Sequence, residues 1–185
     1  MPLMLIDETN LDAYYNIVLV PPFPCVKTED DEIQIAFGFG VVRRAIIEWD
    51  ISAIPLSATI LAVSFNYHGI ENSAENVAAI TRFVTDQPST LDCGTLYAQI
   101  YDNDVYQADW ELQVGENQSF DLCPAVVSDL QAALGTRTWF ALGFFKDVAY
   151  SGTFRFYSSR YGSATPKPTL SVSYSLPGSF GTIID

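Results

Sequence analysis

Residues that could support catalysis are few in this chain, and they form no catalytic pattern. Nucleophilic catalysis usually needs a histidine, and the single one, His68, lies in VSFNYHG, an alternating segment typical of a strand. No G-x-S-x-G motif is present, and FGFGVVRR (37–44) is no phosphate loop because the chain continues there as a strand. Carboxylate pairs arise by chance among 22 acidic residues, so their spacing does not indicate glycoside cleavage. We therefore expect that the protein is not an enzyme.

Oxygen ligands for a metal ion gather in one segment, YDNDVYQAD (101–109). Asp102, Asn103 and Asp104 are residue types that bind Ca²⁺, although the segment lacks the spacing of an EF-hand loop. The alternative is a solvated turn, in which Asp and Asn are ordinary residues. We predict that no cofactor is required, with Ca²⁺ at Asp102 and Asp104 as the alternative.

Aromatic residues make up 14% of the chain and include ten tyrosines. Flat aromatic faces stack on sugar rings, while neighbouring polar groups bind the hydroxyls. The segment FYSSRYG offers such a platform, and the residues predicted to bind a glycan are Tyr101, Tyr106, Tyr157, Arg160 and Tyr161. The same residue types also fill sandwich cores and anchor protein interfaces, so composition alone does not separate these roles.

Composition limits the size and the partners of the protein. A chain of 185 residues with 49% hydrophobic and 17% charged residues is expected to form one globular domain over residues 1–185. Its net charge of -13 repels phosphates and anionic lipid, which argues against nucleic acid as a partner. No segment approaches the length of a membrane span, and the acidic start MPLMLIDETN does not resemble a signal peptide.

The elements that must position these residues are mostly strands. Short apolar or alternating runs, separated by Gly, Pro, Asn or Asp, predict an all-β fold with about ten strands. The expected strands cover residues 13–20, 32–38, 41–49, 58–68, 76–84, 106–113, 117–122, 138–145, 152–158 and 168–175. So many strands in a small domain should split into two packed sheets or close into a barrel.

One short helix is predicted at PAVVSDLQAALG (124–135), with Pro124 at its first turn and Gly135 after its end. We expect it to close one end of the strand layers. A weaker helix or an irregular loop is expected over residues 87–100, where Gly94 interrupts a mixed pattern.

The cysteines Cys25, Cys93 and Cys123 are few, widely spaced and without histidines nearby, so they match neither a disulfide framework nor a zinc site. We interpret them as buried thiols. The alternative, for a protein that matures outside the cell, is a Cys93–Cys123 bridge with Cys25 free.

Both ends of the chain carry apolar residues beyond the regular strand pattern. These are Leu3 and Leu5 near the start, and Phe180, Ile183 and Ile184 near the finish. Two interpretations remain open: arms that dock on a neighbouring subunit, or end strands of the same sheet.

Three blocks in fixed order carry a resemblance: RRAIIEWDISAIPLSATILAVSF, SFDLCPAVVSDLQAAL and FRFYSSRYGSATPKPTLSVSY. They resemble the DNRLRE (disaggregatase-related) family of β-sandwich domains and related carbohydrate-binding modules. The residues that match the family pattern are Arg44, Ile47, Trp49, Asp50, Pro55, Ala58, Thr59, Ile60, Phe120, Asp121, Leu122, Ser159, Arg160, Pro168, Leu170, Val172 and Tyr174. The chain departs from it at Trp49, where Phe is usual, at Cys123-Pro124, where Thr is usual, and in residues 86–118.

The resemblance implies a two-sheet antiparallel jelly-roll sandwich that is not catalytic and is often tied to polysaccharide. Such a jelly roll, together with the apolar ends and a start that does not resemble a signal peptide, predicts a structural or interaction module at a virion or extracellular surface, such as a decoration, capsid-associated or fibre protein. Its partners would be other protein subunits. The alternative is a carbohydrate-binding module for a polysaccharide, with or without calcium.

Overall fold

The computed structural model describes residues 2–7, 9–18, 25–38, 41–73, 77–146, 152–162 and 167–177, and it confirms an all-β fold. The strands are β1 (Leu3–Ile6), β2 (Thr9–Val18), β3 (Cys25–Thr28), β4 (Glu32–Gly38), β5 (Val41–Asp50), β6 (Thr59–Asn72), β7 (Val77–Phe83), β8 (Val105–Glu111), β9 (Gly115–Asp121), β10 (Trp139–Phe145), β11 (Gly152–Tyr157) and β12 (Thr169–Ser175). The helical elements are η1 (Pro88–Thr90), α1 (Cys93–Asp102) and α2 (Pro124–Ala133). All ten expected strands occur, and β1 and β3 are additional short ones.

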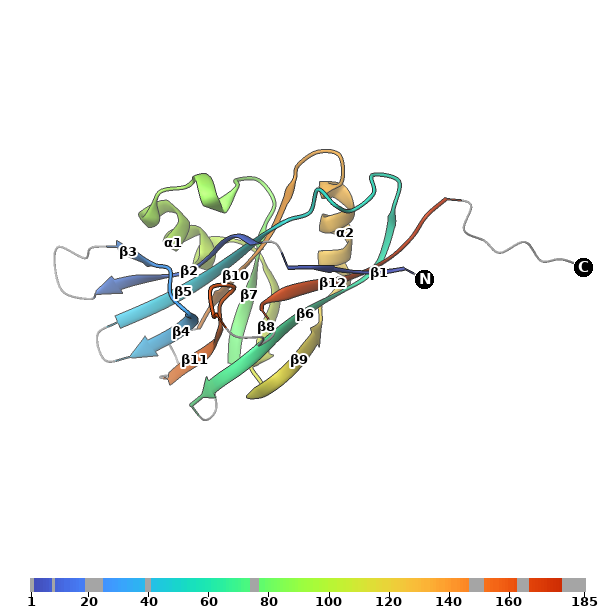
Figure 1. Ribbon diagram of the computed structural model, residues 1–185. Coiled ribbons are helices and arrows are strands. Elements are labelled where there is room, and N and C mark those ends of the chain that lie inside the picture. Colours follow the sequence, from blue (N-terminus) through green and yellow to red (C-terminus); the bar gives the residue numbers. More distant parts are fainter. Residues whose placement is uncertain are drawn as a thin grey trace, which may run out of the picture.

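The strands form one curled, 12-stranded antiparallel sheet in the order β1-β12-β6-β11-β4-β5-β10-β7-β8 (Figure 1). Off this order, β2 pairs with β5, β3 with β2, and β9 with β6. Two long strands make the curl possible because each changes partner along its length. Residues 59–66 of β6 pair with β12, whereas residues 69–72 pair with β11. In the same way, β5 pairs first with β4 and then with β10.

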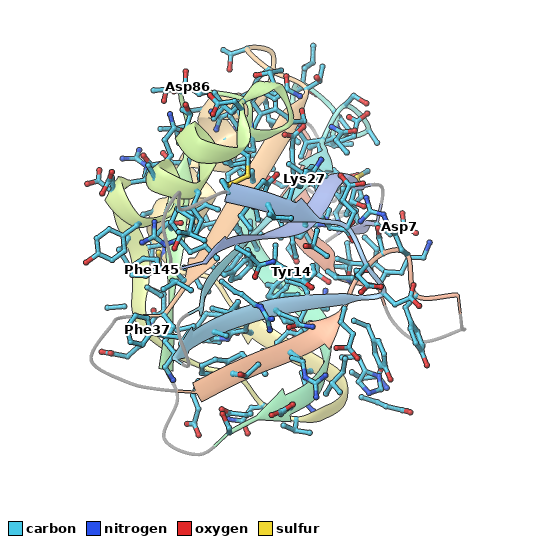
Figure 2. All side chains as sticks on the ribbon, turned by 90° about the vertical axis from the view of Figure 1, so that its left-hand side faces the viewer. Asp7, Tyr14, Lys27, Phe37, Asp86 and Phe145 are labelled. Carbon is cyan, nitrogen blue, oxygen red and sulfur yellow. A yellow bond between two sulfur atoms is a disulfide. The ribbon has the colours of Figure 1, made fainter. Side chains whose placement is uncertain are left out.

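Side chains fill the interior of the curl (Figure 2). Aromatic side chains among them gather around Phe65. The ring of Phe65 lies 5.3 to 6.0 Å, centroid to centroid, from five other rings, those of Trp49, Tyr67, Trp110, Phe144 and Phe156. In β5 the side chains alternate between the two faces of the sheet: Ala45, Ile47 and Trp49 belong to this interior cluster, whereas Ile46 belongs to a second cluster on the outer face.

The predicted helix is confirmed as α2, whose buried residues Val126, Leu130 and Ala133 pack against β6 and β10 at one end of the curl. Of the two alternatives expected over residues 87–100, the helix is confirmed, because residues 93–102 form α1. Asp92 caps this helix by accepting hydrogen bonds from the amides of Gly94 and Thr95. Gly94 therefore sits in the first turn, where it does not interrupt the helix.

A second apolar cluster lies between α1 and the outer face of the sheet, where Leu96 and Ile100 meet Ile46 and Ala141. The Arg44 guanidinium also holds α1, because it lies 4.0 Å from the ring centre of Tyr97 and 4.6 Å from that of Tyr101. No helix in the described ranges is long and apolar enough to cross a lipid bilayer.

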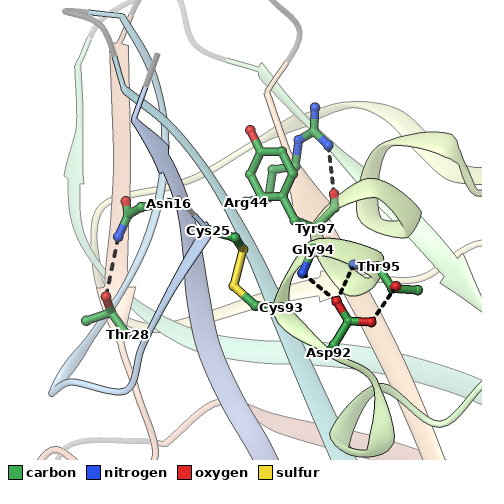
Figure 3. The surroundings of a disulfide bond; sticks show 9 residues. All are labelled: Asn16, Cys25, Thr28, Arg44, Asp92, Cys93, Gly94, Thr95 and Tyr97. Carbon is green, nitrogen blue, oxygen red and sulfur yellow. Dashed lines mark hydrogen bonds between the residues drawn. A yellow bond between two sulfur atoms is a disulfide. The ribbon is translucent and has the colours of Figure 1, made fainter. Parts of the chain in front are cut away.

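Cys25 and Cys93 form a disulfide between β3 and the first turn of α1 (Figure 3). The interpretation of these cysteines as thiols is wrong, and so is the alternative Cys93–Cys123 bridge. Cys123 is the free cysteine and precedes α2. The spacing along the chain could not show the pairing, because Cys25 comes close to Cys93 only when β3 folds back along β2.

The two interpretations of the chain start are resolved for residues 3–6, which form an end strand of the molecule's own sheet, because β1 pairs with β12. Docking by Leu3 and Leu5 remains open, because their side chains are exposed. The residues proposed for the other arm, Phe180, Ile183 and Ile184, lie outside the described residues.

The connection between β8 and β9 is fixed against β6 by a close backbone approach. A Cβ atom on Gly69 would lie 2.0 Å from the carbonyl oxygen of Gln113, and the amide of Gln113 donates a 3.0 Å hydrogen bond to the Tyr67 hydroxyl. Position 69 must therefore be glycine for this connection to cross β6.

We predict that Gly69→Ala lowers the free energy of unfolding by about 3 kcal/mol, because the obstacle is backbone that cannot rotate away. Urea denaturation of the purified protein measures the change. Gly162→Ala is the matched control, since a Cβ there meets nothing within 4 Å and should leave stability within about 0.5 kcal/mol of the parent. Equal stability of the two variants would contradict the packing described.

Candidate functional site

One polar cluster joins three elements at the mouth of a cavity that we call the Arg82 pocket. It is lined by Arg82, Asp104, Val105, Tyr106, Ala125, Ser128 and Asp129, and its volume is about 520 Å³. A cavity of this size is within the range of small-molecule sites.

Asp129 of α2 is the centre of the cluster. Its carboxylate accepts two 2.6 Å hydrogen bonds from Arg82 of β7 and one of 2.6 Å from the hydroxyl of Tyr106 of β8. Asp129 is only 8% exposed, so these bonds lie at the edge of the core. The arrangement fixes the middle of α2 relative to the β7–β8 pair.

The turn between α1 and β8 forms hydrogen bonds with the backbone of Arg82. The Asn103 side-chain amide donates to the Arg82 carbonyl oxygen, and the Arg82 amide donates to the Asp104 carbonyl oxygen. A smaller cavity of about 170 Å³ lies on this side and shares Arg82 and Asp104 with the Arg82 pocket. The Arg82 side chain therefore forms part of the wall of both cavities.

The ionisation states in the cluster follow from this geometry. Burial by itself raises the pKa of Asp129, but the hydrogen bonds from Arg82 and Tyr106 outweigh burial, and the net pKa is lowered. The hydrogen bond to Asp129 raises the pKa of Arg82, and burial raises that of Tyr106. At neutral pH the cluster thus holds an ion pair and a protonated tyrosine.

The predicted calcium ligands are not arranged as a metal site. The Arg82 guanidinium lies 3.7 Å from the carboxylate of Asp104, and a cation there opposes the binding of Ca²⁺. Asp102 is at the end of α1, and within the described ranges no three His, Cys, Asp or Glu side chains converge. The calcium alternative gains no support from this arrangement.

The predicted glycan residues do not form one surface, since they contact different neighbours. Tyr106 lines the Arg82 pocket, and Tyr101 packs against Arg44 and Phe145. Tyr157 and Tyr161 do come together, stacked with ring centres 3.7 Å apart.

The side chain of Arg160 ties its loop to β2 and to Glu29. Its guanidinium donates to the carboxylate and the carbonyl oxygen of the buried Asp12 and lies 3.1 Å from the carboxylate of Glu29. Arg160 therefore anchors the segment that carries the stacked tyrosines.

Arg82, Ser128 and Asp129 were missed by the sequence analysis, which treated their segments as a strand and a helix. One signal was present, because Asp129 is an acidic residue beside the apolar face of the predicted helix. Its arginine partner, 47 residues away, left no such signal.

A different kind of site lies at the edges of the sheet. Among the described strands, β1, β3, β8 and β9 each pair on one side only. The last three carry charged residues, namely Lys27 in β3, Asp109 and Glu111 in β8, and Glu116 and Asp121 in β9. In contrast, β1 has no charge, and its residues Leu3 and Leu5 are 64% and 63% exposed. It is therefore the edge least protected against pairing with another strand.

Comparison with known proteins adds no relative: no protein-family model matches the chain, and no curated protein matches it in sequence. The likeness to the DNRLRE family remains a resemblance in the three sequence blocks.

We predict that Asp129→Asn lowers the free energy of unfolding by about 1.5–3 kcal/mol at pH 7, because it weakens charge-assisted hydrogen bonds in a nearly buried site. Folding lowers the pKa of Asp129. The ionised carboxylate therefore contributes fully to the free energy of unfolding above the unfolded-state pKa of about 3.9, and this contribution is lost as the pH falls through the lower native pKa.

Urea denaturation of the parent and of the variant between pH 7 and pH 2 measures this difference in stability. Asp109→Asn is the control, because Asp109 is exposed on β8. A difference between parent and Asp129→Asn that stays constant down to pH 2 would show that the ion pair is not its cause.

Proposed function

We propose that the protein is a non-catalytic structural and interaction module, a jelly-roll subunit of a virion surface or another surface assembly. It would join other protein subunits by accepting a strand at β1. The observation that carries this proposal is the open, uncharged edge of β1 with the exposed side chains of Leu3 and Leu5.

Strand addition is supported by the chemistry of an open edge. The backbone amides and carbonyls on the free side of an edge strand are unpaired. An added strand forms hydrogen bonds with them, and the residues around the added strand cover the exposed apolar side chains of the edge. Natural proteins usually block such edges with charge, as β3, β8 and β9 do here. A charge-free edge is therefore best explained as a docking edge.

The jelly-roll assignment is supported by contacts across the interior. Phe65 of β6 meets Trp49 of β5 and Phe144 of β10, so the strands beside β6 face those beside β5. We assign β1, β12, β6 and β9 to one layer, and β3, β2, β5, β10, β7 and β8 to the other, with β11 and β4 joining them.

The disulfide between Cys25 and Cys93 supports a place outside the reducing cytosol. Disulfides persist mainly in secreted proteins and at virion or cell surfaces, where thiols are not kept reduced. This agrees with the proposed surface assembly.

We predict that Leu5→Lys lowers incorporation of the chain into its native assembly at least about tenfold, because a lysine at an edge opposes strand pairing. The tagged variant and the untagged parent are co-expressed in the cells that normally produce the protein. The fraction of tagged chains in the isolated assemblies is then measured. The control is Leu56→Lys, since Leu56 is also exposed (74%) but lies in the turn between β5 and β6. Equal incorporation of both variants would refute docking at β1.

Polysaccharide binding is a second candidate, favoured by the Arg82 pocket. One cationic and two anionic side chains line it, so a charged ligand of either sign meets a group that repels it. A neutral polyhydroxyl ligand instead finds a donor in Arg82, acceptors in Asp104 and Ser128, and the ring of Tyr106.

For this candidate we predict binding to a neutral polysaccharide that persists in EDTA and falls about tenfold in Asp104→Ala, because one charged hydrogen-bond partner is lost. Affinity electrophoresis through gels containing neutral or anionic polysaccharides measures it. Asp104 has an 86% exposed side chain, so the variant should fold normally. Asp109→Ala, on β8 outside the pocket, is the control. Loss of binding only in EDTA would favour calcium, and no binding to any polysaccharide would exclude this candidate.

A further inference from the structure

We infer that the partner at β1 is a second copy of this chain, and that the two copies pair their β1 strands antiparallel about a twofold axis. This inference rests on the function proposed above and names the partner. It is carried by the outer surface next to β1, which we call the neutral face. It comprises the outward side chains of β1, β12 and the first half of β6, among them Leu3, Leu5, Ser64, Asn66, Ser171 and Ser173.

The strand register defines the neutral face. Leu3 lies opposite Ser173, Leu5 opposite Ser171, and Ser171 opposite Ser64, so these side chains follow each other across three strands. The residues between them, such as Val172 and Val63, are buried in the core. On the other layer, α1 covers the outer face of β5 and β10, whereas no described element packs over the neutral face.

Charge selects a second copy as the occupant. The chain carries a net charge of -13, so two copies repel each other over most orientations. The strands β1 and β12 and residues 59–66 of β6 contain no charged residue at all. Two copies therefore meet with less repulsion here than at the acidic surfaces. The charge nearest to the face is the carboxylate of Asp121 in β9, which accepts a 2.7 Å hydrogen bond from the Ser64 hydroxyl. A basic partner would gain nothing here and would bind the acidic surfaces instead.

Asn66, the one amide side chain of the neutral face, is already paired, so covering it costs little. The Asn66 amide donates hydrogen bonds of 3.1 Å to the Thr169 hydroxyl and 2.7 Å to the Ser171 hydroxyl, and its oxygen accepts one of 2.9 Å from Ser119. A buried polar group is costly mainly when it loses its partners. This face can thus lose water without leaving Asn66 unsatisfied.

The symmetry of strand pairing gives a closed dimer. When the same strand from two copies pairs antiparallel, each β1 contributes the same backbone groups and the same leucines, which makes the contact self-complementary. The β1-β12-β6-β9 layers of both copies then form one continuous sheet. After pairing, β1 is no longer an edge, so assembly through this contact stops at two.

Sedimentation velocity of the purified full chain over a range of concentrations tests the inference. We expect a dimer of twice 20.4 kDa, with association strengthened by added NaCl because salt screens the repulsion between acidic copies. Leu5→Lys should weaken dimerisation at least about 100-fold, and the Leu56→Lys control should leave it unchanged. Circular dichroism verifies that each variant is folded.

A second variant tests the geometry without disturbing the edge. In a Cys123→Ser background, Leu5→Cys should be cross-linked between copies by a short bis-maleimide, whereas Leu56→Cys should not. A monomer at all concentrations and salt levels, or a dimer that Leu5→Lys leaves intact, would overturn the inference. If Leu5→Lys were nevertheless excluded from the native assembly, the partner would be a different protein and the proposed function would stand. If the dimer formed but Leu5→Lys entered the assembly normally, the proposed function would fail instead.

Discussion

The packing of aromatic rings around Phe65 is the interaction on which the structure depends. The rings that meet there come from β5, β6, β8, β10 and β11, strands spread over most of the chain, and all of them are fully buried. Ring pairs of this kind contribute about 0.5–1.5 kcal/mol each beyond the burial of their area. A flat sheet could not bring these strands together, so the curl of β5 and β6 and the aromatic core require each other.

The curl also decides which surfaces remain available. One end is closed by α2, whose Asp129 is tied to Arg82 and Tyr106, and this contact leaves the Arg82 pocket beside it. One outer face is covered by α1, which the Cys25–Cys93 bridge and the Arg44 stack hold in place. Among the described residues, the neutral face and the open edge of β1 have no helix over them. The two candidate sites are thus consequences of where the helices lie.

Much of the fold was predictable, because it is encoded by neighbouring residues. Alternation such as that of Ala45, Ile47 and Trp49 locates strands, and Pro124 with Gly135 marks a helix. The strand β3 was missed, and β1 was expected only as one of two alternatives. Each has four residues, which is too short for a period of two to stand out. In α1, the cap by Asp92 outweighs the presence of Gly94, and composition alone did not reveal this.

In the candidate sites, too, contacts between residues close in sequence were predictable, and contacts between distant residues were not. The closeness of Tyr157 and Tyr161 was predictable because one short segment carries both. The Arg82–Asp129–Tyr106 contact and the Cys25–Cys93 bridge were not, because their members lie on elements far apart in sequence. The sequence by itself determined an acidic, all-β chain with strands, a helix and no catalytic pattern, since these properties depend on composition and on near neighbours. Only the tertiary structure decided the disulfide, the pocket and the open edge, because each depends on how the curled sheet brings distant strands together.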